Sequence, residues 1–401
     1  MPNALFRPPA LIAALALLAA LYEWALFATT FSHPGVIGPN YNTPGTDWMV
    51  FYTAARSFWQ GQLGVLADGG RFTALLNQNF SHLLTQPLSY RPWIAPPHLL
   101  LVLLPFGLLS FAAAYVLFQL ASAGALLASL RAGARDAKSA WAIGALAILC
   151  PAAALNVVDG QTGFFIAALL IGGFRLVEKR PIAAGILFGL LTVKPQYFVL
   201  VPVALIAARH WRALLATFVC ALALAAASVA LFGLEPWVLW LHKVMEGDPQ
   251  WIEHGRLWGN SIYACAIILG APNGFASALQ AAGLIAGAAA VYAGFRRIRE
   301  NELKWALLLA MAFLVAPHSG PYEAMMPVVA GLLWLKHAKA PAELWRWLIV
   351  LAVWLVPLVS PPAVSPPGRF VPLLFALLAG LILLEGWKEQ AKWERNASGP
   401  P

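Results

Sequence analysis

The loop after the first apolar segment contains Pro44-Gly45-Thr46-Asp47-Trp48-Met49-Val50-Phe51-Tyr52. Pro-Gly is a turn signal, and an acidic residue behind it suits the first turn of a helix. Apolar residues then recur at i, i+3, i+4 and i+7, which predicts an amphipathic helix over residues 48–59. Aromatic-rich helices of this kind beside an apolar span are typical of the membrane interface. The stretch therefore predicts a membrane protein whose first loop presents the carboxylate of Asp47.

The composition of the whole chain agrees with that interpretation. Of its 401 residues, 61% are hydrophobic and only 11% are charged, and the mean hydropathy is +0.73. Because lipid cannot satisfy backbone polar groups, we expect one all-α polytopic membrane domain over residues 1–401. Cys150, Cys220 and Cys265 have unrelated spacings, which fits neither disulfides nor a metal site. The sequence has no Gly-rich nucleotide loop and no cluster of metal-ligand histidines and cysteines, so we expect no cofactor and no metal.

The apolar runs divide into about twelve predicted spans. The first covers residues 11–27, and we interpret Glu23 in its outer third as snorkelling to the interface, with a functional role as the alternative. A polar loop over 29–110 follows. In it, residues 48–59 and 72–84 predict amphipathic helices, and the short apolar run 96–109 predicts a re-entrant or interfacial segment. The later spans are predicted at 111–130, 139–155, 164–177, 182–193, 197–208, 214–232, 275–295, 305–315, 325–335, 344–359 and 371–387.

Basic residues indicate which side of the membrane each loop faces. With these spans, both termini share a side whose loops hold 19 of the 26 lysines and arginines. They are Arg7, Arg131, Arg135, Lys138, Arg175, Lys179, Arg180, Arg209, Arg212, Arg296, Arg297, Arg299, Lys304, Lys336, Lys339, Arg346, Lys388, Lys392 and Arg395. This bias is typical of the cytoplasmic side, and it explains the net charge of +9 without a nucleic-acid partner. We therefore expect a bacterial inner-membrane protein with cytoplasmic termini, a cytoplasmic tail over 388–401 and a periplasmic first loop.

The informative polar residues then fall together at the periplasmic face, in several different loops. They are Asp47, Tyr52, Arg91, Asp159, Gln161, Lys194, Gln196, Arg256, Asn260, His318, Tyr322 and Glu323. Proline or glycine stands beside most of them, which suits broken helix ends that line a cavity. Ionisable residues at membrane depth are candidates for function. The structural alternatives are an N-cap for Asp47 and a snorkelling side chain for Lys194. Asp159-Gly160 could be an ordinary turn, His318 a loop histidine with its own partner, and Arg91 and Arg256 could pair with interfacial lipid phosphate.

This set of residues suits an anionic lipid substrate. Lysine and arginine hold a phosphate and offset charge on a leaving group, and a separate carboxylate can take a proton from an attacking hydroxyl. Together they predict glycosyl transfer from a lipid-phosphate sugar, since nucleotide sugars are not expected on the outer face. A phosphate-ester hydrolase would need a nucleophile–base pair or metal ligands, which the pattern lacks. A lipid or solute transporter, or flippase, is one alternative, although the chain shows no internal repeat. Another is a catalytically inactive relative that only binds lipid.

The layout resembles the GT-C superfamily and, within it, glycosyltransferase family 87, the polyprenol-phosphate-mannose-dependent mannosyltransferases. The resemblance covers roughly residues 11–335. It rests on the outer-loop Asp47, Pro96-Pro97, Asp159-Gly160-Gln161, Lys194-Pro195-Gln196, and Pro317-His318 with Tyr322-Glu323. Two positions depart from the pattern, because Asn is commoner in place of Asp159 and Tyr-Asp is commoner in place of Tyr322-Glu323.

The resemblance implies a GT-C-like helical bundle and an inverting, metal-independent transfer of a hexose, mannose first, from a polyprenyl-phosphate donor. It implies that Asp47 is the general base on the acceptor hydroxyl, and that Lys194 and His318 lie at the donor phosphate. We add Arg91 and Arg256 to the donor-phosphate residues. Substrate binding is assigned to Tyr52, Asp159, Gln161, Gln196, Asn260, Tyr322 and Glu323. The expected partners are the sugar donor, a glycolipid or glycan acceptor, and the lipid bilayer.

Overall fold

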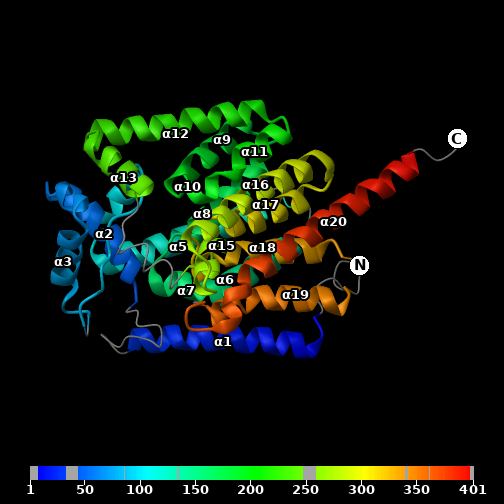
Figure 1. Ribbon diagram of the computed structural model, residues 1–401, viewed down its shortest axis with the longest axis horizontal. Helices are drawn as coiled ribbons and strands as arrows, with labels where there is room; N and C mark the ends of the chain where they lie inside the picture. Colours follow the sequence, from blue (N-terminus) through cyan, green and yellow to red (C-terminus); the bar gives the residue numbers. More distant parts are fainter. Residues whose placement is uncertain are drawn as a thin grey trace.

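The chain folds into a bundle of helices (Figure 1). The computed structural model describes residues 8–32, 44–84, 86–132, 134, 136–246, 259–338, 342–360 and 362–397. Throughout these ranges the chain forms helices, turns and loops, with no strand. The all-α prediction is therefore confirmed for the part of the chain that the structure describes.

Five helices within those ranges are long and apolar enough to cross a bilayer. They are α1 (Ala10–Ser32), α5 (Phe111–Arg131), α12 (Trp211–Phe232), α16 (Asn273–Arg297) and α20 (Val371–Ala397). A sixth candidate is the pair α6 (Ala137–Leu149) and α7 (Pro151–Asp159), between which the chain bends by 54°. The bend falls at Pro151, because proline cannot continue the hydrogen bonding of α6. Helix lengths therefore do not confirm the prediction of about twelve spans.

Shorter helices occupy the other predicted spans. They are α8 (Gly163–Leu176), α9 (Pro181–Leu190), η4 (Leu191–Val193), α10 (Pro195–Phe198), α11 (Leu200–Ala207), α17 (Asn301–Val315), α18 (Met325–Lys336), α19 (Leu344–Trp354) and η6 (Val356–Val359). Almost every side chain of α8, α17 and α18 is buried, so these helices lie inside the bundle. At 1.5 Å per residue they measure roughly 20 Å, which is short of a hydrocarbon core of roughly 30 Å. One end of each of these three helices adjoins a loop that carries predicted site residues.

One carboxylate forms ion pairs between α8, α17 and α18 at the ends of these helices that lie opposite the site loops. Glu302, in the first turn of α17, lies 3.5 Å from Nη2 of Arg175 in α8 and 2.8 Å from Nζ of Lys336 in α18. The guanidinium of Arg175 also lies over the ring of Trp305, 4.6 Å from its centroid. This cluster fixes α8, α17 and α18 relative to one another, and so fixes the loops at their opposite ends.

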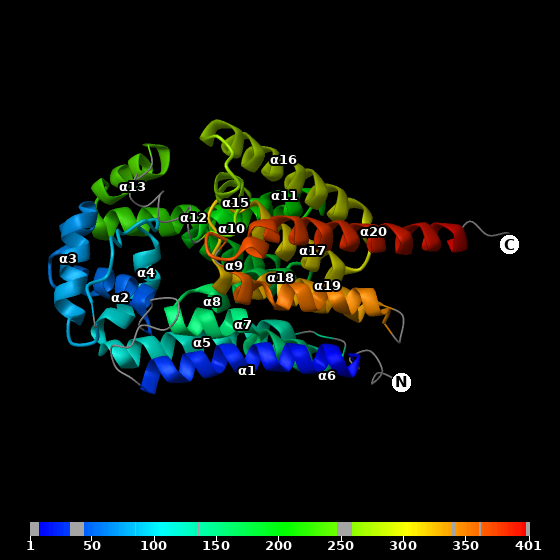
Figure 2. The same cartoon turned by 60° about the horizontal axis from the view of Figure 1, so that its bottom comes forward.

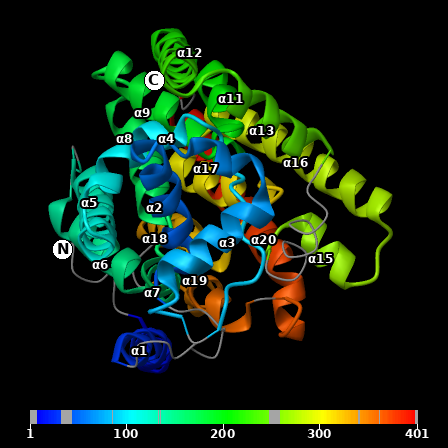
Figure 3. The same ribbon diagram turned by 90° about the vertical axis from the view of Figure 1, so that its left-hand side faces the viewer.

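The first loop forms helices, as its sequence predicts. They are α2 (Thr46–Trp59), η2 (Leu63–Ala67), α3 (Gly69–Phe80), α4 (Leu99–Leu103) and η3 (Leu104–Leu108). Together with α13 (Glu235–Glu246), α2 and α3 lie across one end of the bundle, opposite the start of α1 and the end of α20 (Figures 2 and 3). The apolar segment α4–η3 is too short to cross a bilayer, as expected for residues 96–109. The remaining short helices are α15 (Ile262–Ile268), η5 (Pro321–Glu323) and η7 (Pro366–Phe370).

The apolar face of α2 packs on protein, so its predicted position in the membrane interface is not confirmed. Trp48 is fully buried, and its ring stacks on that of Phe118 in α5 with centroids 4.8 Å apart. Gly160, at φ +73° between α7 and α8, approaches Trp48 so closely that a Cβ there would lie 2.4 Å from the Trp48 Cβ. The N–H of Gly45 bonds to the carbonyl of Val158 at 2.5 Å. These contacts bring the start of α2 against the α7–α8 turn.

Candidate active site

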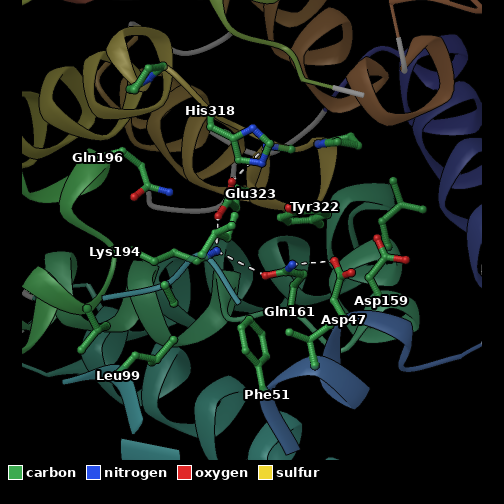
Figure 4. A pocket seen from close by; sticks show the side chains of 18 of the residues that line it. Asp47, Phe51, Leu99, Asp159, Gln161, Lys194, Gln196, His318, Tyr322 and Glu323 are labelled. Carbon is green, nitrogen blue, oxygen red and sulfur yellow. Dashed lines mark hydrogen bonds and ion pairs between the residues drawn. The ribbon is translucent and has the colours of Figure 1, made fainter. Parts of the chain in front are cut away.

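A cavity of about 760 Å³ lies where the short helices end. Its walls come from α1, the start of α2, residues 89–96, the α7–α8 turn, residues 193–199, α13 and residues 315–323, with single residues from α16 and beyond η6. The lining includes many of the predicted site residues, shown in part in Figure 4: Asp47, Arg91, Asp159, Gln161, Lys194, Gln196, His318, Tyr322 and Glu323. Residues from distant parts of the sequence therefore converge here.

Asp47 stands in the first turn of α2, and its carboxylate lines the cavity (Figure 4). Nε2 of Gln161 donates a 2.6 Å hydrogen bond to its Oδ2, and Nη1 of Arg91 lies 3.6 Å from its Oδ1. The N-cap of α2 is Gly45, and no side-chain bond caps this helix. The capping alternative for Asp47 therefore finds no support. Residues from two other segments hold the carboxylate at the cavity.

The side-chain amide of Gln161 connects Asp47 to Lys194. Its Oε1 accepts a 3.3 Å bond from Nζ of Lys194, so one amide lies between the carboxylate and the ammonium group. The same Nζ donates a 2.6 Å bond to Oε1 of Glu323. Figure 4 shows these contacts running from Asp47 through Gln161 to Lys194 and turning there to Glu323. This series of contacts joins the start of α2 to the α7–α8 turn, the segment after η4 and the segment before α18.

Both carboxylate oxygens of Glu323 are occupied, and the residue is only 2% exposed. Oε1 accepts from Lys194, while Oε2 accepts from the hydroxyl of Tyr197 and from the N–H of Gly320, the latter at 3.1 Å. A carboxylate this deeply buried is stable only when it is paired and hydrogen-bonded. Glu323 therefore orients the ammonium group of Lys194, and has little capacity left for the direct substrate contact that the sequence suggested.

Two buried amide side chains hold the backbone of Gln161 in place through hydrogen bonds. Nε2 of Gln119 in α5 donates to the backbone carbonyl of Gln161 at 3.0 Å, and Nδ2 of Asn156 donates to Oε1 of Gln119 at 3.0 Å. Oδ1 of Asn156 accepts the N–H of Gly163, the first residue of α8, at 2.7 Å. These bonds satisfy the buried polar groups of the α7–α8 turn. The sequence analysis did not select Gln119, Asn156 and Tyr197. The available signal for each was a polar side chain within an apolar helical segment.

His318 lies at the Lys194 end of the cavity, and Tyr322 lies between Lys194 and Asp47 (Figure 4). Nζ of Lys194 is 5.8 Å from the centroid of the Tyr322 ring, within cation–π range. Burial lowers the pKa of His318 below its usual 6.5, and the nearby Lys194 lowers it further, although Glu323 and Asp47 oppose the shift. The imidazole is therefore neutral at pH 7. The permanent positive charge at this end of the cavity comes from Lys194.

Arg91, Asp159 and Gln196 also line the cavity, and Arg91 lies beside Asp47. The prediction grouped Arg91 with Lys194 at a donor phosphate. In the structure its guanidinium lies 3.6 Å from the carboxylate of Asp47, so that carboxylate offsets its charge. This position makes Arg91 a partner of the acid, while Gln196 stays beside Lys194 in the chain and in the cavity.

Tyr52 and Asn260 face protein and are not among the residues that line the cavity. The hydroxyl of Tyr52 donates to the backbone carbonyl of Leu109 at 2.8 Å. Asn260 is 2% exposed, with its Nδ2 3.0 Å from Oγ of Ser360 and its N–H bonded to the backbone carbonyl of Ser319. Neither side chain is placed to touch a bound substrate. The predicted phosphate ligand Arg256 lies outside the described residues.

Glu23 lines the cavity, so its interpretation as a snorkelling side chain is wrong. A glutamate that reached the interface would be exposed, whereas Glu23 is 6% exposed. It lies on the same buried stripe of α1 as Ile12, Ala19 and Ala20. The small residues one turn before Glu23 were the available sequence signal, because close helix packing favours small side chains.

The fold and the cavity define a class: an all-helical membrane protein whose candidate active site lies at the ends of short buried helices. The model of glycosyltransferase family 87 matches residues 93–317, more than half of the chain. The chain belongs to glycosyltransferase family 87, as the resemblance predicted, and it is a membrane glycosyltransferase. The matched region includes Gln161 and Lys194 and ends one residue before His318. Searches of curated proteins and of solved structures found no match.

Proposed function

We propose that this glycosyltransferase moves a hexose, with mannose as the first candidate, from a polyprenyl-phosphate donor to a hydroxyl of a glycolipid or glycan acceptor. The acceptor oxygen attacks C1 of the sugar, the bond between C1 and the phosphate oxygen breaks, and polyprenyl phosphate leaves. Attack opposite the leaving group inverts the anomeric centre. The observation that carries this proposal is the side-chain amide of Gln161, which bonds to both Asp47 and Lys194. The amide holds a carboxylate that can act as a base at a fixed separation from a positively charged group.

Asp47 is the general base in this reaction. Its side chain is 20% exposed and lines the cavity, so an acceptor hydroxyl can reach it. The carboxylate takes the hydroxyl proton as the new glycosidic bond forms. Gln161 contacts one of its oxygens and Arg91 the other, and these two contacts fix the direction in which the base points.

Lys194 binds the donor phosphate in this reaction. Its ammonium group offsets the negative charge that develops on the phosphate oxygen as the bond to C1 breaks. Glu323 holds that group in place through the 2.6 Å ion pair, and the neutral imidazole of His318 serves as a hydrogen-bonding partner for the phosphate. The charge for leaving-group departure thus comes from a protein side chain, and the mechanism requires no metal ion.

Apolar side chains in the wall of the cavity suit the isoprenoid chain of the donor. They are Val193 and Val199 around the α10 turn, Val244 in α13 and Leu284 in α16. Only 17% of the apolar window of α16 is buried, so this part of the cavity borders a helix whose other side is exposed. A lipid tail that lies between α13 and α16 would keep its apolar surface out of water while the phosphate reaches Lys194.

We further propose that the cavity faces the periplasm of a bacterial inner membrane. The helices of the first loop lie at one end of the bundle, and α1 begins and α20 ends at the other (Figure 2). The loops at the second end carry most of the basic residues, which supports a cytoplasmic position for that end. A lipid-linked sugar is a suitable donor on the periplasmic side, where nucleotide sugars are not expected.

Transfer of labelled sugar in proteoliposomes tests this proposal. Wild-type protein with polyprenyl-phosphate mannose and octyl α-mannoside should form a labelled dimannoside, and Asp47→Asn should lower the rate roughly 10²–10⁴-fold. Glu300→Gln makes the same chemical change at the opposite end of α17 from the cavity and should leave the rate unchanged. Undiminished transfer by Asp47→Asn would reject the assigned base. Movement of the lipid across the bilayer without product would favour the transporter.

A further inference from the structure

Helix α1 turns one narrow stripe of side chains toward the bundle. Ile12, Ala19, Ala20 and Glu23 are buried, and Glu23 is the acidic residue among them. The large side chains on the other faces of the helix are more than half exposed, for example Leu17, Leu18 and Leu21. A carboxyl group on the inward stripe of such an apolar helix needs a reason, because lipid and packed side chains both disfavour it.

Two indole hydrogen bonds fix the rotation of α1. Nε1 of Trp24 donates to the carbonyl of Leu149 at the end of α6, at 3.1 Å. From the other flank, Nε1 of Trp354 in α19 donates to the carbonyl of Ala16 in α1, also at 3.1 Å. The helix is therefore held from both sides, one residue after Glu23 and about two turns before it. These two hydrogen bonds keep the carboxyl group of Glu23 facing the cavity.

Among the described residues, none gives the Glu23 carboxyl group a hydrogen bond or an ion pair, although the residue is 6% exposed and lines the cavity. Burial of a carboxyl group without a partner is unfavourable. A hydroxyl group of a ligand in the cavity would satisfy it. Leu26 and Phe27 from α1 and Leu155 and Val158 from α7 line the same cavity, and their side chains cannot form such a bond.

Charge differs between the walls of the cavity, and the guanidinium of Arg91 lies beside Asp47. Lys194 and His318 stand at one end, whereas the lining residues that α1 and α7 contribute include Glu23 and Asp159 and no basic side chain. Carboxyl oxygens accept hydrogen bonds from hydroxyl groups, and a wall without basic side chains offers a phosphate no counter-charge. The wall formed by α1 and α7, called here the α1–α7 wall, therefore suits a neutral polyhydroxylated ligand. It does not suit the phosphate of the donor.

We propose that Glu23 binds a hydroxyl group of the acceptor, and that the acceptor presents a neutral sugar to the α1–α7 wall. The inference rests on the proposed function and narrows its acceptor class. A phosphorylated head group would meet carboxylates, and a serine hydroxyl in a peptide would leave Glu23 without a partner. Glu23 acts here in binding, while Asp47 remains the base.

Kinetics with octyl α-mannoside and its monodeoxy analogues test this assignment. Glu23→Leu removes the carboxyl group, and Glu23→Gln keeps its size and one acceptor oxygen. We expect the acceptor KM to rise roughly tenfold in Glu23→Leu, since loss of one hydrogen bond to a buried carboxyl group has about that effect. The KM for the donor should stay within about twofold, since Lys194 bonds to Gln161 and Glu323 and not to Glu23. Tyr22→Phe, at an exposed neighbour on the same helix, is the matched control and should leave both values unchanged.

The deoxy analogues separate binding from a merely structural role. The analogue that lacks the hydroxyl bound by Glu23 should be a poor acceptor for the wild type, and this penalty should vanish in Glu23→Leu. An unchanged acceptor KM in both Glu23 variants, or the same deoxy penalties in wild type and variants, overturns this inference and leaves the proposed function standing. Failure of the wild type to use any acceptor overturns the proposed function together with it.

Two further results bear on the acceptor class and on folding. Preferential transfer to a mannoside phosphate or to a serine-containing peptide, compared with octyl α-mannoside, overturns the neutral-sugar assignment. If Glu23→Leu does not fold, Glu23→Gln decides the question through the same comparison of deoxy analogues, because it preserves the volume of the side chain.

Discussion

Gln161 and Asp47 meet through a 2.6 Å hydrogen bond, although 114 residues separate them in the sequence. The bond joins the turn before α8 to the first turn of α2, and the close approach of Gly160 to Trp48 holds the same two segments together. The other end of the amide accepts a bond from Lys194. Because the amide nitrogen donates to Asp47 and the amide oxygen accepts from Lys194, the side chain of Gln161 is held in one orientation. Gln161 therefore sets the spacing between the base and the donor phosphate in the proposed reaction.

Replacement of Gln161 should slow the chemical step more than it weakens donor binding. In Gln161→Leu neither Asp47 nor Lys194 keeps its bond to the amide, and loss of alignment on this scale lowers kcat roughly 100-fold. The Kd for polyprenyl phosphate should change less than about threefold, because Glu323 still holds Lys194. Gln78→Leu, at an exposed position of α3, is the control. A kcat for Gln161→Leu close to that of Gln78→Leu would show that the bridge has no part in catalysis.

The Lys194–Glu323 ion pair should be needed for stability and for activity in separable ways. Glu323→Gln leaves the lysine without its counter-charge beside a residue that is only 2% exposed, which should cost about 3 kcal/mol of unfolding free energy. Lys194→Met leaves the carboxylate unpaired and should be destabilising as well. It also removes the charge at the leaving group, so kcat should fall roughly 10²–10³-fold. Thermal unfolding in detergent and transfer kinetics measure the two effects.

The double variant Lys194→Met/Glu323→Gln separates these effects. With neither charge present, much of the lost stability should return, because no buried ion is left without a partner. Activity should stay as low as in Lys194→Met. Recovery of transfer along with stability would mean that Lys194 is structural and that another group offsets the charge on the phosphate.

The pH dependence of transfer should show that His318 acts as a neutral group. Burial lowers the pKa of His318 from its usual 6.5, so the imidazole is mainly neutral at pH 7 and loses little further proton as the pH rises. The ratio of wild-type to His318→Gln activity should therefore be nearly constant from pH 7 upward. A change in the ratio should appear only in more acidic solution, where the imidazole takes up a proton. A ratio that varies between pH 7 and 8 would contradict the direction of this shift.

Local sequence signals predicted the helical class, the helix that begins at Asp47 and many of the residues that meet in the cavity. Each depends on neighbours in sequence: hydrophobic periodicity, a Pro-Gly turn, or a charged residue at the end of an apolar run. The family resemblance rested on such short motifs as well, and the match over residues 93–317 confirms it. The features that these signals predict depend on neighbouring residues in the sequence and not on tertiary packing.

Side-chain direction was the part that the sequence could not supply. Arg91 was grouped with Lys194 by charge, yet the fold places it beside Asp47. Tyr52 shares a helix with Asp47, yet its hydroxyl bonds to a backbone carbonyl outside the cavity. Glu23 faces inward because two indoles from other helices fix the rotation of α1. Contacts between distant segments decide each of these cases, and a single sequence does not record them.

Gly160→Ala should lower stability and transfer activity together. Gly160 has φ +73°, a left-handed conformation that costs an alanine roughly 1–2 kcal/mol. The added Cβ would also lie 2.4 Å from the Cβ of Trp48, so α2 must shift away from the α7–α8 turn. This shift carries Asp47 away from Gln161. We expect a total loss of about 2–4 kcal/mol in unfolding free energy and a fall in kcat of roughly tenfold or more.

Gly61→Ala separates backbone strain from the steric contact in this experiment. Gly61 also has a positive φ, +69°, but a Cβ there meets nothing within 4 Å. It should therefore show only the backbone cost, roughly 1–2 kcal/mol, with kcat unchanged. The difference in kcat between Gly160→Ala and Gly61→Ala then measures how strongly the packing of Trp48 against the α7–α8 turn positions the base. Equal kcat values in the two variants would mean that Asp47 keeps its place when that packing is disturbed.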